Sequence, residues 1–436
     1  MLVHAGEALL AARPKKIALS GPAGFLGSRV VRQILDAHQF RKAHGAPPGE
    51  LLLLSSSPGT LMSALLRREG RERMATLRAC RVDYYHQHDV DSWQDQLGSL
   101  GLGGDSSIFV NLAALAGPRV DRPDAMMAVN YRAPMAAARA CEQLGFGHYV
   151  QSSTQATKAE RAGQARLAKI MRMCDFTLAR MPKLPVSLLI TGLLYCRDAR
   201  VVGQAGEVMN LVDLALLPVT PVMGDGSAPL QPLEVGDCAA RIAALALGEA
   251  SLRVRHESSQ GLVESSWARL ALLNQRLQYT LRVYDAVGPE TLSLLELLRL
   301  FARLNGRTLR PAFVGYRNTE LVLNVASLGN LNRQFVSLLR SEQGAASPSV
   351  GDARAFEKLL GPEAKLARIG DALANIDAAG LPIPPKKFPF AQTMLWAARN
   401  PGVIAPGLQL LGEVAHSFAT RRSPKDALGP REGPLD

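Results

Sequence analysis

Three glycines punctuate a short segment near the start of the chain, directly after the apolar residues 16–20. The segment consists of Gly21, Pro22, Ala23, Gly24, Phe25, Leu26 and Gly27. Glycine lets the backbone turn tightly and approach a ligand that a Cβ atom would keep away. A helix that begins at such a turn can hold a phosphate on its N-terminal N–H groups. The spacing predicts a turn that binds the pyrophosphate of a dinucleotide, and the alternative is a strand–helix turn that binds no ligand.

Short apolar runs alternate with helical stretches on both sides of this turn. The runs of strand length are residues 16–20, 51–55, 77–82, 107–114, 148–152 and 186–195. Residues 25–39 and 125–144 have helical patterns. This alternation is typical of βαβ units and predicts an α/β fold with a doubly wound parallel sheet of the Rossmann type. Ligands of such sheets bind at the carboxyl ends of the strands.

The pattern changes along the chain and predicts four parts. Residues 1–15 form an N-terminal extension, and residues 16–200 form the dinucleotide-binding domain. Residues 201–375 form a smaller mixed C-terminal subdomain that is interleaved with the Rossmann core. Residues 376–436, which begin with several prolines, form an appended amphipathic and helical tail that faces a partner or a membrane.

The Gly-x-x-Gly-Phe-Leu-Gly order resembles the phosphate turn of the extended and atypical short-chain dehydrogenase/reductase family, which includes NAD-dependent epimerases and dehydratases. Other segments resemble this family in the same order along the chain. They are His88–Asp91, Asn111–Ala114, Val129–Asn130, Ser152–Thr154, Gln231–Asp237 and Tyr284–Glu296. The resemblance covers residues 15–365 and implies cofactor contacts beyond the glycine turn. The implied contacts are Asp89 and Val90 at the adenine, Leu112, Ala113 and Ala114 at the nicotinamide ribose, and Ser152 at the end of the fifth strand.

Enzymes of this family use a tyrosine as acid and base, with a lysine four residues later. A phenol with a pKa of ~10 needs such a cation beside it to act near neutral pH. None of the eight tyrosines in this chain has a lysine four positions on. The best match is Ala165 to Lys169, so the resemblance implies that Lys169 is kept as a ribose ligand while alanine replaces the proton carrier. We therefore predict no catalytic residue of this kind, and the alternative for Lys169 is a surface lysine.

The identity of the dinucleotide depends on the end of the second strand. An acidic residue there binds the ribose diol of NAD, whereas a cation accommodates the 2′-phosphate of NADP. This chain has Ser55 and Ser56 there, no acid, and Arg67, Arg68 and Arg71 downstream. We expect NADP(H) in preference to NAD(H). The alternative is that the arginines form only a solvated helix face.

Composition excludes several other classes of function. The net charge is +12, but the basic residues are spread out and only 5% of residues are aromatic, which argues against a nucleic-acid platform. Five scattered cysteines without a Cys-x-x-Cys pair argue for free thiols and against a disulfide framework or a metal site. No apolar run of about 18 residues predicts a transmembrane helix.

The family resemblance extends to its tyrosine-poor branch, the nucleotide-binding accessory subunits of mitochondrial respiratory complex I. This implies a non-catalytic subunit on the matrix side of the inner membrane that supports assembly, with other subunits of that large complex as partners. The tail over 388–418 would then contact the membrane peripherally. One alternative is an active reductase or epimerase acting on a small carbonyl or nucleotide sugar, and another is a nucleotide-gated regulator or RNA-associated scaffold. A cytoplasmic location is the alternative to the mitochondrion.

Overall fold

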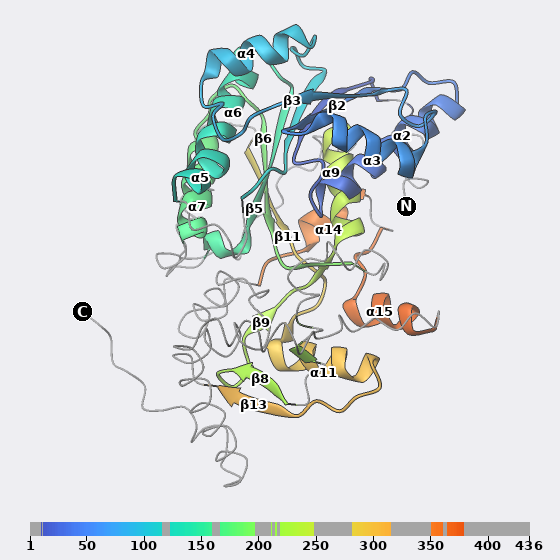
Figure 1. Cartoon of the computed structure of the whole chain (residues 1–436), viewed down its shortest axis with the longest axis vertical. Helices are drawn as coiled ribbons and strands as arrows, with labels where there is room; N and C mark the ends of the chain where they lie inside the picture. The colour runs from blue at the N-terminus through green and yellow to red at the C-terminus, as the bar shows by residue number, and fades with distance from the viewer. Residues whose placement is uncertain are drawn as a thin grey trace, which may run out of the picture. The chain divides into compact units, whose positions relative to one another are not determined.

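The computed structural model describes most of the first half of the chain and parts of the second (Figure 1). The described residues are 10, 12–115, 123–158, 166–196, 211, 214–215, 219–247, 281–314, 350–360 and 364–378. The chain divides into two compact units. The first comprises Met1–Gly192, Leu233–Pro289 and Gly351–Ala367, and the second comprises Leu193–Pro232, Glu290–Val350 and Arg368–Asp436. Residues 1–9 of the predicted extension and 379–436 of the predicted tail lie outside the described residues.

The first unit is built on a parallel sheet of seven strands. Its strands are β1 (Lys16–Ser20), β2 (Glu50–Ser55), β3 (Leu77–Arg81), β4 (Ser107–Asn111), β5 (His148–Thr154), β6 (Val186–Thr191) and β11 (Leu281–Ala286). They lie in the order β11-β6-β5-β4-β1-β2-β3. The strand order reverses at β1 and β4, which pair from Lys16 with Ser107 to Ser20 with Asn111. The predicted doubly wound Rossmann-type fold is confirmed, and β1 and β4 form its topological switch point.

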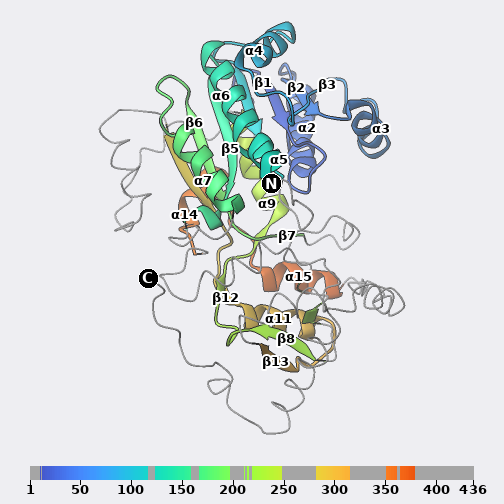
Figure 2. The ribbon, with the colours of Figure 1, turned by 60° about the vertical axis from the view of Figure 1, so that its left-hand side comes forward.

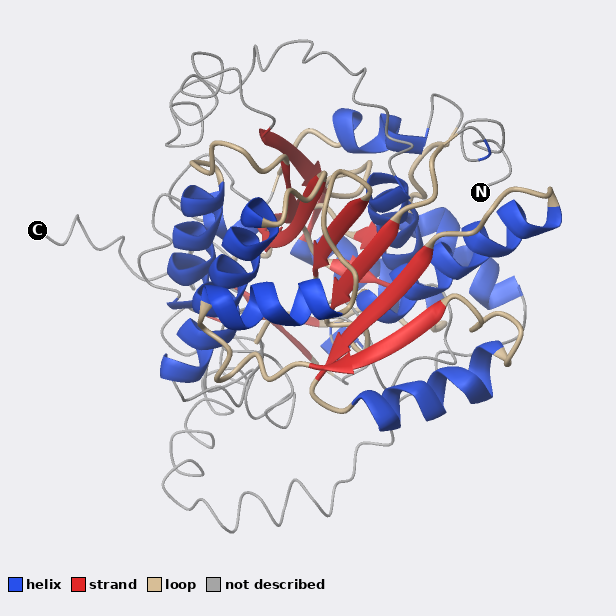
Figure 3. Cartoon of the chain, turned by 90° about the horizontal axis from the view of Figure 1, so that it is seen from above, coloured by secondary structure: helices blue, strands red, loops and turns tan. Residues whose placement is uncertain are grey.

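Helices cover both faces of this sheet (Figure 3). They are α2 (Gly27–Ala43), α3 (Pro58–Glu69), α4 (Val90–Ser99), α5 (Pro123–Met127), η2 (Ala128–Arg132), α6 (Ala133–Gln143), α7 (Arg166–Leu178) and α9 (Val235–Leu247). On one face α2 packs against α9, and on the other α6 packs against both α4 and α7 (Figure 2). The predicted helix over 125–144 is present, but η2 is a π-helical turn within it.

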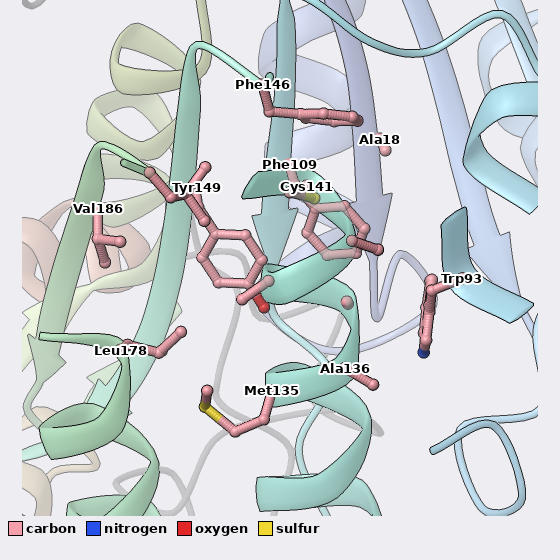
Figure 4. Close-up of a cluster of buried hydrophobic side chains, with 14 of the residues drawn as sticks. Ala18, Trp93, Phe109, Met135, Ala136, Cys141, Phe146, Tyr149, Leu178 and Val186 are labelled. Atoms are coloured by element: carbon pink, nitrogen blue, oxygen red, sulfur yellow. The ribbon is translucent and has the colours of Figure 1, made fainter. Parts of the chain in front are cut away.

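Aromatic rings fill the core on the α6 face of the sheet (Figure 4). Phe109 of β4 and Tyr149 of β5 are paired in register, and their rings stack with centroids 5.2 Å apart. Trp93 of α4 meets Phe109 edge-on at 5.9 Å. The Tyr149 hydroxyl donates to the carbonyl oxygen of Pro134 at 3.2 Å, so this buried phenol has a structural partner. These rings fix β4 and β5 against α4 and α6.

Three strands end earlier than predicted. β3 ends at Arg81 and not at Val82. β4 ends at Asn111 and not at Ala114, because the chain leaves the sheet where its backbone meets the glycine turn. β6 ends at Thr191 and not at Tyr195. The pair Leu194–Tyr195 is a separate short strand, β7.

The second unit has short described elements. They are β8 (Thr220–Met223), β9 (Pro229–Leu230), β12 (Leu292–Ser293), α11 (Leu294–Leu304), β13 (Pro311–Val314) and α15 (Ile369–Ala378). β8 pairs with β13, β9 pairs with β12, and α11 begins with a capping box formed by Ser293 and Glu296. None of the described helices has the length and apolar character that crossing a bilayer requires.

A buried arginine joins the late segments of the chain to the Rossmann unit. Arg241 of α9 has no exposed surface. Its guanidinium donates to the carbonyl oxygens of Phe356 at 3.1 Å, Glu357 at 3.4 Å and Ala364 at 2.5 Å. It also donates to the carbonyl oxygen of Asp237 at 3.1 Å. One side chain thus satisfies backbone acceptors that burial would otherwise leave without donors.

We predict that Arg241→Met lowers the free energy of unfolding by about 3–5 kcal/mol, because it strands buried carbonyl groups and a neighbouring buried carboxylate. Urea unfolding followed by tryptophan fluorescence measures the loss. Arg241→Lys keeps the charge and some of the donors, so its loss should be smaller. A free energy of unfolding for Arg241→Met within about 1 kcal/mol of the wild type would contradict this role.

Candidate functional site

The glycine turn lies at the carboxyl end of β1, at the topological switch point. Gly21 follows β1 with φ +73°, and the Gly24 N–H donates to the Gly21 carbonyl oxygen at 3.1 Å. α2 begins at Gly27. Ala23 and Gly24 are exposed, whereas Gly27 is buried. The turn therefore presents its middle residues, and not its ends, to solvent.

Backbone packing behind the turn leaves no room for side chains. A Cβ atom at Gly27 would lie 2.0 Å from the Gly21 carbonyl oxygen. A Cβ atom at Gly21 would lie 2.8 Å from both the Leu112 carbonyl oxygen and the Ala113 nitrogen. At Gly24 the nearest atom would be the Gly21 oxygen at 3.3 Å, and the residue faces outward. Packing therefore requires glycine at positions 21 and 27, while the Gly24 backbone is exposed to solvent. This arrangement fits a cradle for a pyrophosphate at the start of α2.

A chain of buried polar side chains joins the ends of three strands beneath this turn. Ser20 of β1 donates through its hydroxyl to Asn111 Oδ1 of β4. Asn111 Nδ2 donates to Gln151 Oε1 of β5 at 2.9 Å, and Gln151 Nε2 donates to the Ser152 carbonyl oxygen at 2.7 Å. The Ala113 N–H donates to Ser20 Oγ at 3.3 Å. This chain sets the position of the glycine turn relative to β4 and β5.

The sequence analysis gave Ser20 and Gln151 no role. The feature of the sequence that indicates one is a polar residue near the end of an otherwise apolar strand. Such a residue has to find a partner when the strand is buried on both faces. The sequence does not identify that partner, because the strand order decides which polar ends lie side by side.

The segment after β4 is held by a residue of the π-helical turn. Asn130 Oδ1 accepts the Leu115 N–H at 2.8 Å, and its Nδ2 donates to the Leu115 carbonyl oxygen at 3.0 Å. Leu112 and Ala113 are half-buried, and Ala114 is exposed. The three residues predicted at the nicotinamide ribose therefore lie on an anchored loop at the same sheet edge as the glycine turn.

The end of β2 offers hydroxyl groups and no acid. Ser55 is half-buried and its Oγ accepts the Ser57 N–H at 3.2 Å, while Ser56 is exposed. Arg68 donates to the Ser28 carbonyl oxygen at 3.1 Å, on the first turn of α2. Arg67 and Arg71 have exposed side chains. All three predicted phosphate ligands are exposed, and Arg68 is in addition hydrogen-bonded to α2.

Arg68 also belongs to a charge cluster between α2 and α3. Glu69, whose side chain is 1% exposed, contacts Arg68 at 2.7 Å, Arg73 at 2.8 Å and Arg32 at 3.3 Å. Burial opposes ionisation of Glu69, but the Arg68 hydrogen bond and the charges of the three arginines hold its pKa below the ordinary value. The carboxylate therefore stays charged and fixes Arg68 beside the start of α2.

Two further predicted residues lie after β3. Asp89 is exposed, and its Oδ2 caps α4 by accepting the Ser92 N–H at 2.8 Å. Val90 is half-buried against the aromatic core. Capping of α4 is by itself a sufficient reason for an aspartate at position 89. Its contact with adenine stays a prediction.

The ends of β5 and β6 carry hydroxyl groups. Ser152 is half-buried, with its Oγ 3.5 Å from Thr191 Oγ1. Lys169 is exposed on α7, whose neighbouring Ala168, Met171 and Cys174 are buried. Ala165 lies outside the described residues. The structure thus brings the turn, residues 112–114 and Ser152 to one sheet edge, while a ribose contact of Lys169 stays a prediction.

The described part of the chain shows neither a metal-binding group of side chains nor a disulfide. The described residues contain no group of three or more histidine, cysteine, aspartate or glutamate side chains placed to hold a metal ion. All five cysteines lie within the described residues and form no disulfide.

We predict that Gly27→Ala destabilises the Rossmann unit, because its Cβ atom would meet the Gly21 carbonyl oxygen and the backbone cannot yield without moving β1 from α2. The expected loss is about 2 kcal/mol or more, measured by urea unfolding. Gly59→Ala is the matched control, since a Cβ atom at this exposed α3 glycine meets nothing within 4 Å. Equal stability of the two variants would show that the turn is not packed as described.

Comparisons with known proteins show which solved structures resemble this fold. No protein-family model and no curated protein matches this sequence. The Bordetella bronchiseptica enzyme WbmG, solved with NAD and UDP, is 16% identical with a TM-score of 0.51, over 85% of this chain and 97% of that chain. A UDP-N-acetylglucosamine 4-epimerase from Methanobrevibacter ruminantium is 14% identical with a TM-score of 0.47, over 70% and 86%. A UDP-glucose 4-epimerase from Thermus thermophilus, solved with NAD, is 19% identical with a TM-score of 0.43, over 69% and 86%. The WbmG match shows that this chain shares the Rossmann-type α/β fold of that enzyme.

Proposed function

We propose that this chain binds a nicotinamide dinucleotide at the carboxyl ends of β1 and β4 and holds it without tyrosine–lysine proton transfer. The observation that carries the proposal is the glycine turn. Backbone packing excludes a Cβ atom at Gly21 and Gly27, whereas at the exposed Gly24 the crowding is milder, with the Gly21 carbonyl oxygen 3.3 Å from a Cβ atom. A glycine at that position lets a pyrophosphate approach the backbone at the N-terminus of α2.

The absence of the proton carrier rests on the whole sequence, since no tyrosine precedes a lysine by four residues. Two tyrosines of the Rossmann unit have structural roles. The Tyr149 hydroxyl donates to Pro134, and the Tyr84 hydroxyl donates to the Leu54 carbonyl oxygen at 3.3 Å. Burial raises the pKa of both phenols, so neither ionises near neutral pH.

NADP(H) is the preferred form in this proposal. The end of β2 has Ser55 and Ser56 where an acid would bind the ribose diol of NAD, and Arg68 adds positive charge near the start of α2. A 2′-phosphate is compatible with this environment. The end of β2 has no carboxylate that would favour the free ribose diol of NAD.

For the biological role, we propose the accessory function that the sequence resemblance implies. In that role a bound nucleotide stabilises the folded subunit by mass action and is not turned over. Its partners would be other subunits of the respiratory assembly at the mitochondrial inner membrane. Support for this role comes from the resemblance and from the missing tyrosine.

A second candidate is an active epimerase or reductase acting on a carbonyl or a nucleotide sugar. The observation in its favour is the pair of hydroxyl groups of Ser152 and Thr191 at the ends of β5 and β6. Hydroxyl groups can orient a carbonyl, and WbmG, the enzyme whose fold this chain shares, was solved with NAD and UDP. In this case a substrate group would have to supply the proton.

Calorimetric titration with NADPH and NADH tests the proposal, together with absorbance at the nicotinamide band in the presence of UDP-sugars. We expect saturable binding, tighter for NADPH, with no consumption of the dinucleotide. Binding accompanied by sugar conversion supports the second candidate. An absence of binding by folded protein rejects both.

We predict that Gly24→Ala weakens dinucleotide binding at least about 10-fold and lowers the melting temperature of the free protein much less than Gly27→Ala does, because its Cβ atom would lie 3.3 Å from the Gly21 carbonyl oxygen, compared with 2.0 Å for Gly27→Ala. Titration calorimetry and thermal melting report the two quantities separately. Gly59→Ala should change neither. If Gly24→Ala binds the dinucleotide as tightly as the wild type, the exposed centre of the turn is not the contact.

A further inference from the structure

A carboxyl group without exposed surface lies between β5 and α7. Asp175 of α7 is 0% exposed, and its Oδ2 accepts the hydroxyl of Ser153 at 2.5 Å. Its other oxygen, Oδ1, is buried and has no hydrogen-bond partner among the described residues. A buried carboxylate oxygen that receives no donor is costly when charged and inexpensive when protonated.

Few groups near Asp175 can compensate a charge. Arg172, on the same helix, is the cation that acts on it, and the Nε atom of Arg172 donates to the Thr157 carbonyl oxygen at 2.6 Å. The Cys174 thiol also interacts with Asp175, and its pKa is raised by burial and then by Asp175. α5, η2, η3, α6 and β5 also pack against α7, and no charge on their described residues acts on the pKa of Asp175. Burial raises the pKa of Asp175, and two groups oppose this effect. They are the Ser153 hydroxyl, which donates a hydrogen bond, and the charge of Arg172, whose guanidinium also binds Thr157.

We propose that Asp175 is a buried proton-binding site that holds α7 on β5 in its neutral form and weakens this contact when it ionises. Burial raises the pKa of Asp175 to about 7, against opposition from the Ser153 hydrogen bond and then from Arg172. Between about pH 4 and 7 the folded protein keeps a proton that the unfolded chain has released. Stability from this group is therefore greatest at low pH, falls as the pH rises through this window, and is level above it.

This site belongs to no part of the proposed dinucleotide contact. Ser153 points toward α7, while its neighbour Ser152 lies 3.5 Å from Thr191 of β6. The proton-binding site acts on the packing of α7 against the sheet. α7 also carries Lys169, a predicted ribose ligand, but neither Asp175 nor Ser153 is a predicted cofactor contact.

Asp175→Asn tests the proposal, because asparagine has nearly the same shape, still accepts the Ser153 hydroxyl and cannot ionise. We expect the melting temperature of the variant relative to the wild type to rise by about 4 °C between pH 5.5 and pH 8. His38 is buried and His148 is half-buried, and desolvation lowers the pKa of each to about 4, so both also make stability depend on pH. Both proteins contain these histidines, and the difference between the two proteins isolates Asp175.

Amide hydrogen exchange of residues 166–178 supplies a local readout on the full-length chain. After correction for the intrinsic rate, exchange in the wild type should accelerate from pH 5.5 to pH 8, and exchange in Asp175→Asn should not. Ser153→Ala provides a second variant, which removes the Ser153 hydrogen bond that opposes protonation of Asp175, so its transition should move to higher pH. A melting-temperature difference that is constant across this range, or equal acceleration in both proteins, would overturn the proposal.

Discussion

The Rossmann unit depends on close approach of backbone to backbone at one sheet edge. Gly21 lies against the chain that leaves β4, and Gly27 lies against Gly21, so the turn between β1 and α2 has no space for side chains behind it. This packing starts α2 directly after the turn that follows β1. It leaves Ala23 and Gly24 as the solvent-facing part of the turn.

The buried polar chain from Ser20 through Asn111 to Gln151 makes this arrangement specific. Apolar packing alone would hold the strands together but would set their relative positions loosely at the ends. Hydrogen bonds between side chains of β1, β4 and β5 fix the ends where the site is formed, and each polar group finds a partner. The aromatic stack of Phe109 on Tyr149 supports the same strands from the α6 face.

The sequence predicted the fold because its signals are local. Apolar strands separated by helices, and glycines between the first strand and its helix, determine the βαβ order without knowledge of contacts. The partners of Ser20, Gln151 and Asp175 could not be predicted, because they depend on which strands and helices become neighbours. Arg68 shows the same limit. Its charge was evident from the sequence, but its bond to Ser28 and its pairing with Glu69 arise from the packing of α3 on α2.

Native mass spectrometry of the whole chain tests most directly whether the glycine turn holds a dinucleotide. After incubation with NADPH and removal of excess ligand, the spectrum should show a mass increment of one dinucleotide per chain. If the folded chain shows no such increment after incubation with millimolar NADPH or NADH, the turn does not hold a dinucleotide.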